Sequence, residues 1–262
     1  MITRAPVHKS SSIVVDVSVV LLVAAVLYGL VQVARRWQAP LQSTVEITLS
    51  LWALPGYTLL SLLRGFVAYG ISLAFTLTYG YVAAHRPRLE RVMIPLLDIL
   101  QSIPVLGFLP GAVLALVTLF PHTNVGLELA CILMIFTGQA WNMTFGFYQS
   151  LRGIPSELRE AASLYQFNWW QRFRRVELPA AAISLTWNSM MAMAGGWFFL
   201  MVCEAFTLGA HDFRLPGLGA YMSVAIAHHD PQAIVAGIVA MVLMIVIVDA
   251  CLWRPALVWA PT

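Results

Sequence analysis

The chain has 262 residues, of which 60% are hydrophobic and only 10% charged, with a mean hydropathy of +0.80 and a formal net charge of +3. A soluble domain has about a quarter of its residues charged, so this composition excludes an ordinary soluble protein and predicts a surface that faces lipid. The three cysteines lie in apolar runs without the paired spacing of a zinc site or a disulfide framework.

The first predicted membrane span is the apolar run 13–34, whose only charge is Asp16. A helix needs about 20 apolar residues to cross a bilayer, whereas a secretion signal has a shorter apolar region that ends in a cleavage site. We therefore interpret 13–34 as a retained helix. The next apolar segment, 51–64, is interrupted by a Pro-Gly pair and is interpreted as a short helix lying at the membrane interface. The run 66–84 is the second predicted span.

The middle of the chain predicts two further spans and a break. Residues 85–91 form a short basic loop. The run 92–120 contains three prolines and is too long for one straight span. We divide it into a partly polar helix near 92–102 and a span near 104–120. Residues 126–148 form the next span.

The last third holds two more spans, 180–206 and 233–253, and between them a loop at 207–232 that is rich in Gly, His and Asp. The His and Asp residues lack the spacing of a metal site, so we predict no metal, no cofactor and no catalytic residue. The six spans place both termini inside, because the only Lys or Arg residues that then lie outside are Arg35, Arg36, Arg64 and Arg214. We expect Arg64 to reach toward the lipid interface.

A polar island at residues 149–179 separates two of the apolar runs. Pro155 suits the first turn of a helix. Asn168, with Gln171 three residues later, forms a variant of the capping box for a second helix. The island is therefore predicted to be a helix–turn–helix pair at the cytoplasmic face. Taken alone, its shape and charge fit an ordinary inside loop and a docking site equally well.

The order of residues in the island resembles the EAA motif of the membrane permeases of bacterial ABC importers that depend on a binding protein. The motif reads Glu-Ala-Ala, three residues, Gly, nine residues, Ile, any residue, Leu-Pro. It is matched by Glu160, Ala161, Ala162, Leu178 and Pro179, with Val176 in place of Ile. Gln166 stands where the family has a Gly that permits a sharp turn.

The resemblance covers roughly residues 57–255, and 96–110 and 187–206 look like the nitrate/sulfonate/taurine/bicarbonate branch of these permeases. Parts of it also resemble the half-units of double-length permeases. It implies an all-α membrane protein with six transmembrane helices: a type I, MetI-like core of about five, and an N-terminal region, 1–56, that holds the first span. The permease domain is then 57–255, with 149–179 as its coupling loop.

The resemblance also implies partners in a bacterial inner membrane. A dimer of cytoplasmic ABC ATPase subunits grips the loop, a second permease chain, identical or not, completes the path, and a binding protein delivers a small solute of anionic type. The implied coupling residues are Glu157, Glu160, Ala161, Ala162, Tyr165, Gln166, Leu178 and Pro179. The residues independently point to a separate ATPase, because the only lysine, Lys9, has no glycine before it and cannot belong to a Walker A loop.

Polar residues inside spans are candidates for a translocation path, although they suit hydrogen bonds between helices equally well. The candidates are Gln139, Asn142, Asn188, Ser189 and Glu204. An alternative function is a stand-alone channel or a secondary transporter. That alternative leaves the EAA island unexplained, and the chain shows none of the inverted repeats of many secondary transporters. No folded basic patch supports a nucleic-acid partner.

Overall fold

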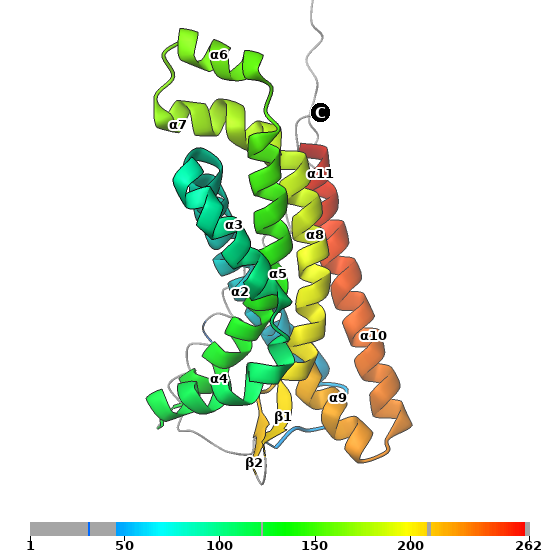
Figure 1. The fold of residues 1–262 in the computed structure, drawn as a ribbon. Coiled ribbons are helices and arrows are strands. Elements are labelled where there is room, and N and C mark those ends of the chain that lie inside the picture. Colours follow the sequence, from blue (N-terminus) through cyan, green and yellow to red (C-terminus); the bar gives the residue numbers. More distant parts are fainter. Residues whose placement is uncertain (1–30, 32–45, 122, 209–210, 260–262) are drawn as a thin grey trace, which may run out of the picture.

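The structure, a computed structural model, describes residue 31 and residues 46–121, 123–208 and 211–259. Long helices run side by side, with a pair of short helices projecting at one end and a two-stranded hairpin at the other (Figure 1). The helices are α2 Leu54–His85, α3 Pro87–Ser102, α4 Val105–Leu119, α5 Val125–Arg152, α6 Ser156–Leu164, α7 Trp169–Arg172, α8 Leu178–Cys203, α9 Leu218–Ala227, α10 Pro231–Val248 and α11 Arg254–Trp259, with π-helical turns η1 Phe173–Glu177 and η2 Asp249–Trp253. The strands are β1 Ala205–Leu208 and β2 His211–Arg214.

Helix α2 begins earlier than the sequence predicted. Pro55 lies in the first turn of α2, where a proline removes no helical hydrogen bond. The helix then continues without a break to His85. The prediction of a separate interfacial helix at 51–64 is therefore wrong, because Leu54 and the residues after it belong to the same helix as the predicted span 66–84.

The chain between α2 and α5 has one sharp break, at the predicted place. Ile103 has an extended conformation (φ −71°, ψ 124°), as expected for a residue that precedes a proline, and α3 meets α4 there at 92°. The division of this stretch into two helices is thus confirmed. The predicted basic loop at 85–91 is wrong, because Pro87 already starts α3 and leaves only Arg86 between the helices.

Three helical runs within the described residues are long and apolar enough to cross a bilayer: α2, α5 and the run Pro231–Val258. The bent pair of α3 and α4 would be a fourth. The predicted spans inside the three runs are 66–84, 126–148 and 233–253. The predicted span 180–206 corresponds to the 26-residue α8, which lies along α5 (Figure 1), and 13–34 lies outside the described residues. The all-α membrane fold is confirmed.

The predicted loop at 207–232 is largely regular structure. The strands pair antiparallel, with Ala205 opposite Arg214, and α9 follows. At the end of α9, His229 has a φ of 51°. The N–H of His229 donates to the carbonyl of Ile226, and the N–H of Asp230 to that of Ala225, which is the Schellman pattern.

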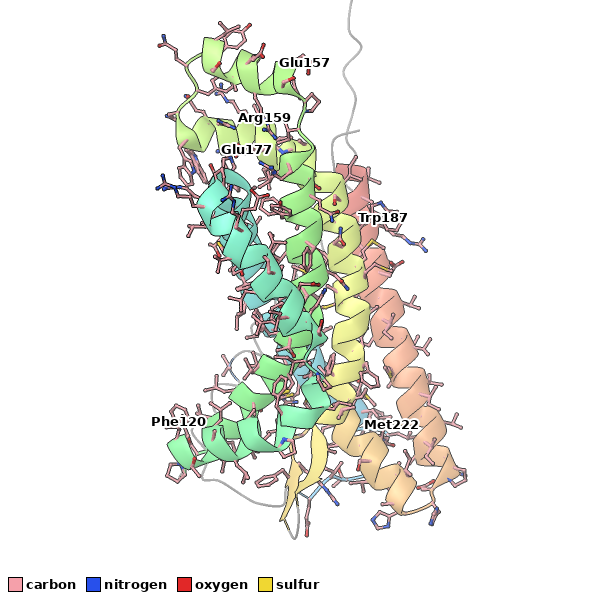
Figure 2. The ribbon with its side chains drawn as sticks, viewed as in Figure 1. Phe120, Glu157, Arg159, Glu177, Trp187 and Met222 are labelled. Atoms are coloured by element: carbon pink, nitrogen blue, oxygen red, sulfur yellow. The ribbon has the colours of Figure 1, made fainter. Side chains whose placement is uncertain are left out.

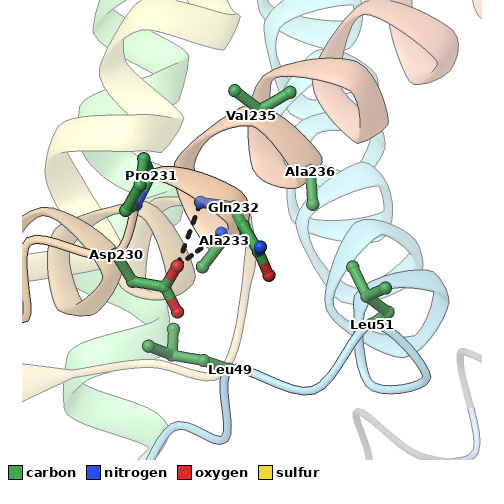
Figure 3. A pocket seen from close by; sticks show the side chains of 8 residues that line it. All are labelled: Leu49, Leu51, Asp230, Pro231, Gln232, Ala233, Val235 and Ala236. Carbon is green, nitrogen blue, oxygen red and sulfur yellow. Dashed lines mark hydrogen bonds between the residues drawn. The ribbon is translucent and has the colours of Figure 1, made fainter.

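Asp230 then caps α10, and a pocket opens beside this cap (Figure 3). The carboxylate accepts from the backbone N–H groups of Gln232 and Ala233, at 3.0 and 3.1 Å. The pocket measures about 540 Å³ and is bounded by Leu49 and Leu51 from the segment before α2. Since the cap already uses the carboxylate and most other lining groups are apolar, the pocket fits hydrocarbon better than a polar ligand.

Candidate functional site

The short helices α6 and α7, with the turn η1, form an element that stands clear of the long helices (Figure 1). We call residues 156–177 the projecting element. Glu157 lies on the outermost helix and Glu177 where the element joins the bundle (Figure 2). Glu157 and Glu160 are exposed, whereas Ala162 is buried. The predicted helix–turn–helix pair is present, and the acidic residues of its first helix are exposed.

The turn inside the projecting element has the geometry that a glycine would normally supply. Gln166 has a φ of 52°, in the left-handed region that non-glycine residues rarely adopt. The N–H of Gln166 donates to the carbonyl of Ser163, and the N–H of Phe167 to that of Ala162, both at 3.0 Å. These bonds are the Schellman pattern. The loss of the motif glycine therefore leaves the sharp turn intact and adds backbone strain to it.

The second helix of the element starts as the sequence predicted. Asn168 Oδ1 accepts from the N–H of Gln171 at 2.8 Å, and the N–H of Asn168 donates to Gln171 Oε1 at 3.0 Å, which is a full capping box. This helix then passes through η1 directly into α8, so Leu178 and Pro179 form the first turn of a long helix.

The projecting element exposes several large apolar side chains. Leu164, Tyr165, Trp169 and Trp170 expose between 53% and 82% of their area. Exposed apolar patches of this kind mark interaction sites, and aromatic residues are enriched in protein interfaces. The element thus presents an apolar surface close to the exposed acidic residues of α6.

A cluster of charges lies where the projecting element joins the bundle. We call His85, Arg172 and Glu177 the root cluster. Glu177 Oε1 accepts from Arg172 Nε at 2.8 Å and lies 2.9 Å from His85 Nε2. Burial alone would raise the pKa of Glu177, but the hydrogen bond and charge of His85, then of Arg172, hold this pKa below its ordinary value.

A second cluster of charges lies inside the bundle toward the hairpin end. We call Arg64, Glu128 and Glu204 the enclosed cluster. The guanidinium of Arg64 binds both oxygens of Glu128 at 2.6 and 2.7 Å, and its Nη1 donates to Glu204 Oε1 at 2.8 Å. Glu204 also accepts from Ser61 Oγ at 2.6 Å and from the N–H of Gly219 at 2.7 Å. All three charged side chains are buried, so the prediction that Arg64 reaches the lipid interface is wrong.

The predicted path residues do not form one group. Gln139 is buried and accepts from Ser72 Oγ at 3.3 Å, and buried Ser189 accepts from Tyr69. Asn188 donates to the carbonyl of Ser184 in its own helix. Glu204 belongs to the enclosed cluster, so for these four residues the contacts favour helix packing. Asn142 is exposed, and its place in a translocation path stays a prediction.

The family of the chain follows from comparison with known proteins. Residues 70–252 match the family described as the binding-protein-dependent transport system inner membrane component. The chain belongs to this family. The matched residues include the whole EAA-like motif, together with Glu128 and Glu204, and begin just after Arg64. Families of this kind contain the transport permeases of ABC importers, so the chain is a multi-pass membrane permease.

Two individual relatives of this permease share little more than a quarter of the aligned residues with it. The putative aliphatic sulfonates transport permease protein SsuC of Bacillus subtilis (strain 168) is 26% identical over 149 residues, which are 57% of this chain and 51% of that protein. The trimethylamine N-oxide transport system permease protein TmoV of Pelagibacter ubique (strain HTCC1062) is 28% identical over 160 residues, which are 61% of this chain and 20% of that protein. The matched region thus spans about half of the first relative and a fifth of the second.

Solved structures agree on the fold of the permease. A chain from an inward-facing MetNI methionine ABC transporter superposes with a TM-score of 0.64 at 19% identity, over 78% of this chain and 96% of that chain. A second crystal form gives 0.61 at 19% identity, over 79% and 97%. At this identity the likeness shows the fold alone, and it confirms the MetI-like architecture.

Sequence reasoning selected no member of the root cluster, and in the enclosed cluster it missed Glu128 and misplaced Arg64. Glu128 lies inside the predicted span 126–148, and an ionisable residue there is a functional candidate by the same rule that selected Glu204. Glu177 occupies the unspecified position of the motif, so the motif gave no reason to select it. His85 fell into the predicted basic loop and therefore looked solvated.

Proposed function

We propose that this permease is the membrane-spanning subunit of an ATP-driven importer for a small organic solute of the sulfonate type. ATP is hydrolysed in separate cytoplasmic subunits that dock on the projecting element. A second permease chain completes the translocation path, and a binding protein delivers the solute from outside. The observation that carries the proposal is the exposed apolar surface on the element that contains the EAA-like motif.

The shape and chemistry of the projecting element suit a protein partner. Its exposed aromatic residues would be unfavourable in water, and the exposed carboxylates of Glu157 and Glu160 on the same element would be unfavourable in hydrocarbon. A protein surface that is apolar at its centre and basic at its rim satisfies both requirements. The small Ala161 next to Glu160 allows close approach of that surface, while Ala162 is buried beneath it.

The orientation follows from the distribution of positive charge. Helix α11 lies at the same end of the bundle as the projecting element (Figure 1), and the arginines near this end include Arg88, Arg159 and Arg174. By the positive-inside rule this end faces the cytoplasm. The docking element and the C-terminus are then cytoplasmic, where an ATPase has access to ATP.

The class of solute rests on the two relatives, which are named for aliphatic sulfonates and for trimethylamine N-oxide. Both are small organic molecules with negatively charged or strongly polar oxygens. Arg64 is occupied by two carboxylates, so it is not available to pair with such an oxygen. A neutral donor such as the exposed amide of Asn142 would bind a solute oxygen more weakly than a charged group, so the solute could also dissociate.

The first test is co-purification of the detergent-solubilised permease, comparing wild type with Glu160→Arg. An ATP-binding subunit should co-purify with wild type and be lost from the variant, because the substitution reverses a charge on the docking surface. Glu46→Arg is the matched control, since it reverses an exposed acidic residue that lies before α2, and it should retain the subunit.

Transport by the purified complex is the second part of the test. In liposomes, uptake of radiolabelled ethanesulfonate should require ATP, and trimethylamine N-oxide serves as the competing candidate. Uptake of either probe without ATP, together with the absence of an ATPase from every preparation, would replace the importer with a channel or a secondary transporter. Uptake of trimethylamine N-oxide alone would keep the importer and correct the solute.

A further inference from the structure

The projecting element is attached to the bundle at three places. Two of them are backbone connections, and the third is a contact between side chains. It follows α5 through residues 153–155 and leads into α8 through η1. Arg159 strengthens the first attachment, because its Nη2 donates to the carbonyls of Leu151 and Arg152 at the end of α5, at 2.9 and 3.0 Å. Helix α2 is not adjacent to the projecting element in sequence. It contacts the element only through side chains.

The most specific contacts with α2 are made by Tyr81 and His85 in its last turns, beside the apolar packing of Leu77 and Ala84 in the same cluster as Phe173 and Val176. The ring of Tyr81 packs edge-on against Trp169 and Phe173, with centroids 6.1 and 5.6 Å apart. His85, the last residue of α2, lies 2.9 Å from Glu177. Packed rings and a bond between neutral groups constrain position less than a hydrogen bond between charged groups, which is shorter and stronger. The ion pair is therefore the contact that resists displacement.

The hydrogen bonds of His85 indicate that its ring is charged. Nδ1 lies 2.9 Å from the carbonyl oxygen of Tyr81, and Nε2 lies 2.9 Å from the carboxylate of Glu177. Both partners are acceptors only, so both bonds form together only when each ring nitrogen has a proton. The pair is then an imidazolium facing a carboxylate whose low pKa keeps it ionised.

The surroundings of Glu177 leave room for this link to change. Its Oε2 is buried and has no hydrogen-bond partner among the described residues. Glu177, His85, Arg159 and Arg172 line a cavity of about 40 Å³, which is enough for a water molecule. The adjoining η1 is a π-helical turn, a feature that often occurs at functional sites. A carboxylate with an unused oxygen next to such a turn can exchange partners when the element moves.

We propose that His85 and Glu177 form a tether through which displacement of the projecting element reaches α2. Both are positioning residues: they contact neither solute nor ATP. The inference rests on the proposed function, because it requires an ATPase that moves the element. Without the tether, the ATPase would still move α5 and α8 through the chain, while α2 would no longer follow.

Hydrogen–deuterium exchange of the permease in nanodiscs tests the tether without knowledge of the solute. Exchange is measured with and without the co-purified ATP-binding subunit, in the presence of a non-hydrolysable ATP analogue. In wild type, the subunit should slow exchange in α6 and also in the last turns of α2, residues 79–85. We expect the slowing in α2 to be roughly fivefold or more, the lower range of couplings between distant sites.

The variants separate the tether from ordinary stability. His85→Phe keeps an aromatic ring to stack on Tyr81, whose centroid lies 4.1 Å from that of His85, and removes both donors. It should keep the slowing in α6 and lose the slowing in α2. Glu177→Gln, similar in size to the native residue, should reduce the slowing in α2. His85→Gln, which can still donate to Glu177, should restore part of it. Asp249→Asn, in an exposed ion pair with Arg254, should behave as wild type.

Two results would overturn the inference: an undiminished response of α2 in His85→Phe, or a wild type in which α6 responds and α2 does not. Absence of any response in wild-type α6 would instead contradict the proposed docking of an ATPase. Exchange in α5 and α8 without the subunit shows whether each variant is folded. The failure of the tether and the failure of the proposed function therefore give different patterns.

Discussion

The enclosed cluster and the root cluster join helices by similar chemistry but differ in how completely they are sealed. In the enclosed cluster the charged side chains expose at most 3% of their area, and every carboxylate oxygen has a hydrogen-bond partner. In the root cluster His85 and Arg172 expose 26% and 38%, and one oxygen of Glu177 has no hydrogen-bond partner in the part of the chain that the structure describes. The first arrangement fixes α2, α5 and α8 in one position, whereas the second can break and form again.

The difference has an energetic basis. A buried charge that loses its partner is strongly destabilising, because neither water nor another group replaces the contact. In the root cluster Glu177 is only 2% exposed, but its partners His85 and Arg172 are partly exposed and are solvated when the pair breaks, so the net value of the pair is smaller. The enclosed cluster should therefore tolerate no rearrangement during transport, and motion should be concentrated around the root cluster.

The largest effect is expected for Arg64→Met, which leaves Glu128 and Glu204 buried without their counter-charge. We expect the free energy of unfolding to fall by about 3–5 kcal/mol, measured by titration with SDS in mixed micelles. Adding Glu128→Leu to Arg64→Met removes one orphaned carboxylate and should recover part of the loss. An unfolding midpoint of Arg64→Met equal to that of wild type would show that the enclosed cluster does not hold the helices together.

A smaller loss is expected for Glu177→Gln in the root cluster. Hydrogen bonds to charged groups contribute about 1.5–3 kcal/mol, and the exposure of His85 and Arg172 reduces this to about 1–2 kcal/mol. The same SDS titration measures it. A loss as large as that of Arg64→Met would show that the two clusters do not differ in the way their exposure indicates.

The pH dependence of Glu177→Gln has a definite sign. Because the folded state lowers the pKa of Glu177, the charged carboxylate stabilises the fold above its unfolded-state pKa. That contribution is lost as the pH falls through the lower, folded-state value. The difference between wild type and Glu177→Gln should therefore shrink below about pH 4, and it should also shrink above neutral pH, where the imidazolium of His85 loses its proton.

Gln166→Gly separates backbone strain from charge within the projecting element. Removing the side chain at a φ of 52° should stabilise the turn by about 1 kcal/mol. Slower amide exchange in α6 would show it, with unchanged exchange in α2. The matched control is Gln171→Gly, which removes half of the capping box and should speed exchange in the same element. Faster exchange in Gln166→Gly would mean that the glutamine side chain stabilises the turn by a contact of its own.

Local signals in the sequence were sufficient for local structure. The capping box of Asn168 and Gln171, and the break before Pro104, each depend on a few adjacent residues and are present as predicted. The motif also located the projecting element, because it specifies residue types at fixed spacing. Pro55 led to a wrong prediction, because a proline that breaks a helix and a proline that starts one look alike without knowledge of where the helix begins.

The charge clusters could not be predicted in the same way. Arg64 meets Glu128 and Glu204 across 64 and 140 positions of sequence, and no local pattern connects them. Their partners became evident only when α2, α5 and α8 were seen to pack together. Polar residues inside apolar runs indicated that their side chains would need hydrogen-bond partners. The sequence did not decide whether those partners are a solute in a path or a neighbouring helix.

The smallest effect is expected for Asp249→Asn, which extends the comparison to an ion pair that is open to its surroundings. Arg254 Nε lies 3.2 Å from Asp249 Oδ2, and the two side chains expose 77% and 40% of their area. If the pair lies at the water interface, its removal should change the free energy of unfolding by less than about 0.5 kcal/mol. The SDS titration used for the other variants measures it, and Arg254→Gln should give the same small value.

The outcome for this pair also locates the membrane boundary. Asp249 and Arg254 follow α10, at the end of the apolar run Pro231–Val258. A charge left alone in hydrocarbon is costly, with about 2.5–3.5 kcal/mol for an Arg or Asp at the centre of a spanning helix. A loss above about 2 kcal/mol in either variant would therefore place the pair inside the lipid, and the order of effects would then follow access to water rather than exposed area. A loss near zero would mean that the stabilisation falls in the order enclosed cluster, root cluster, exposed Asp249–Arg254 pair.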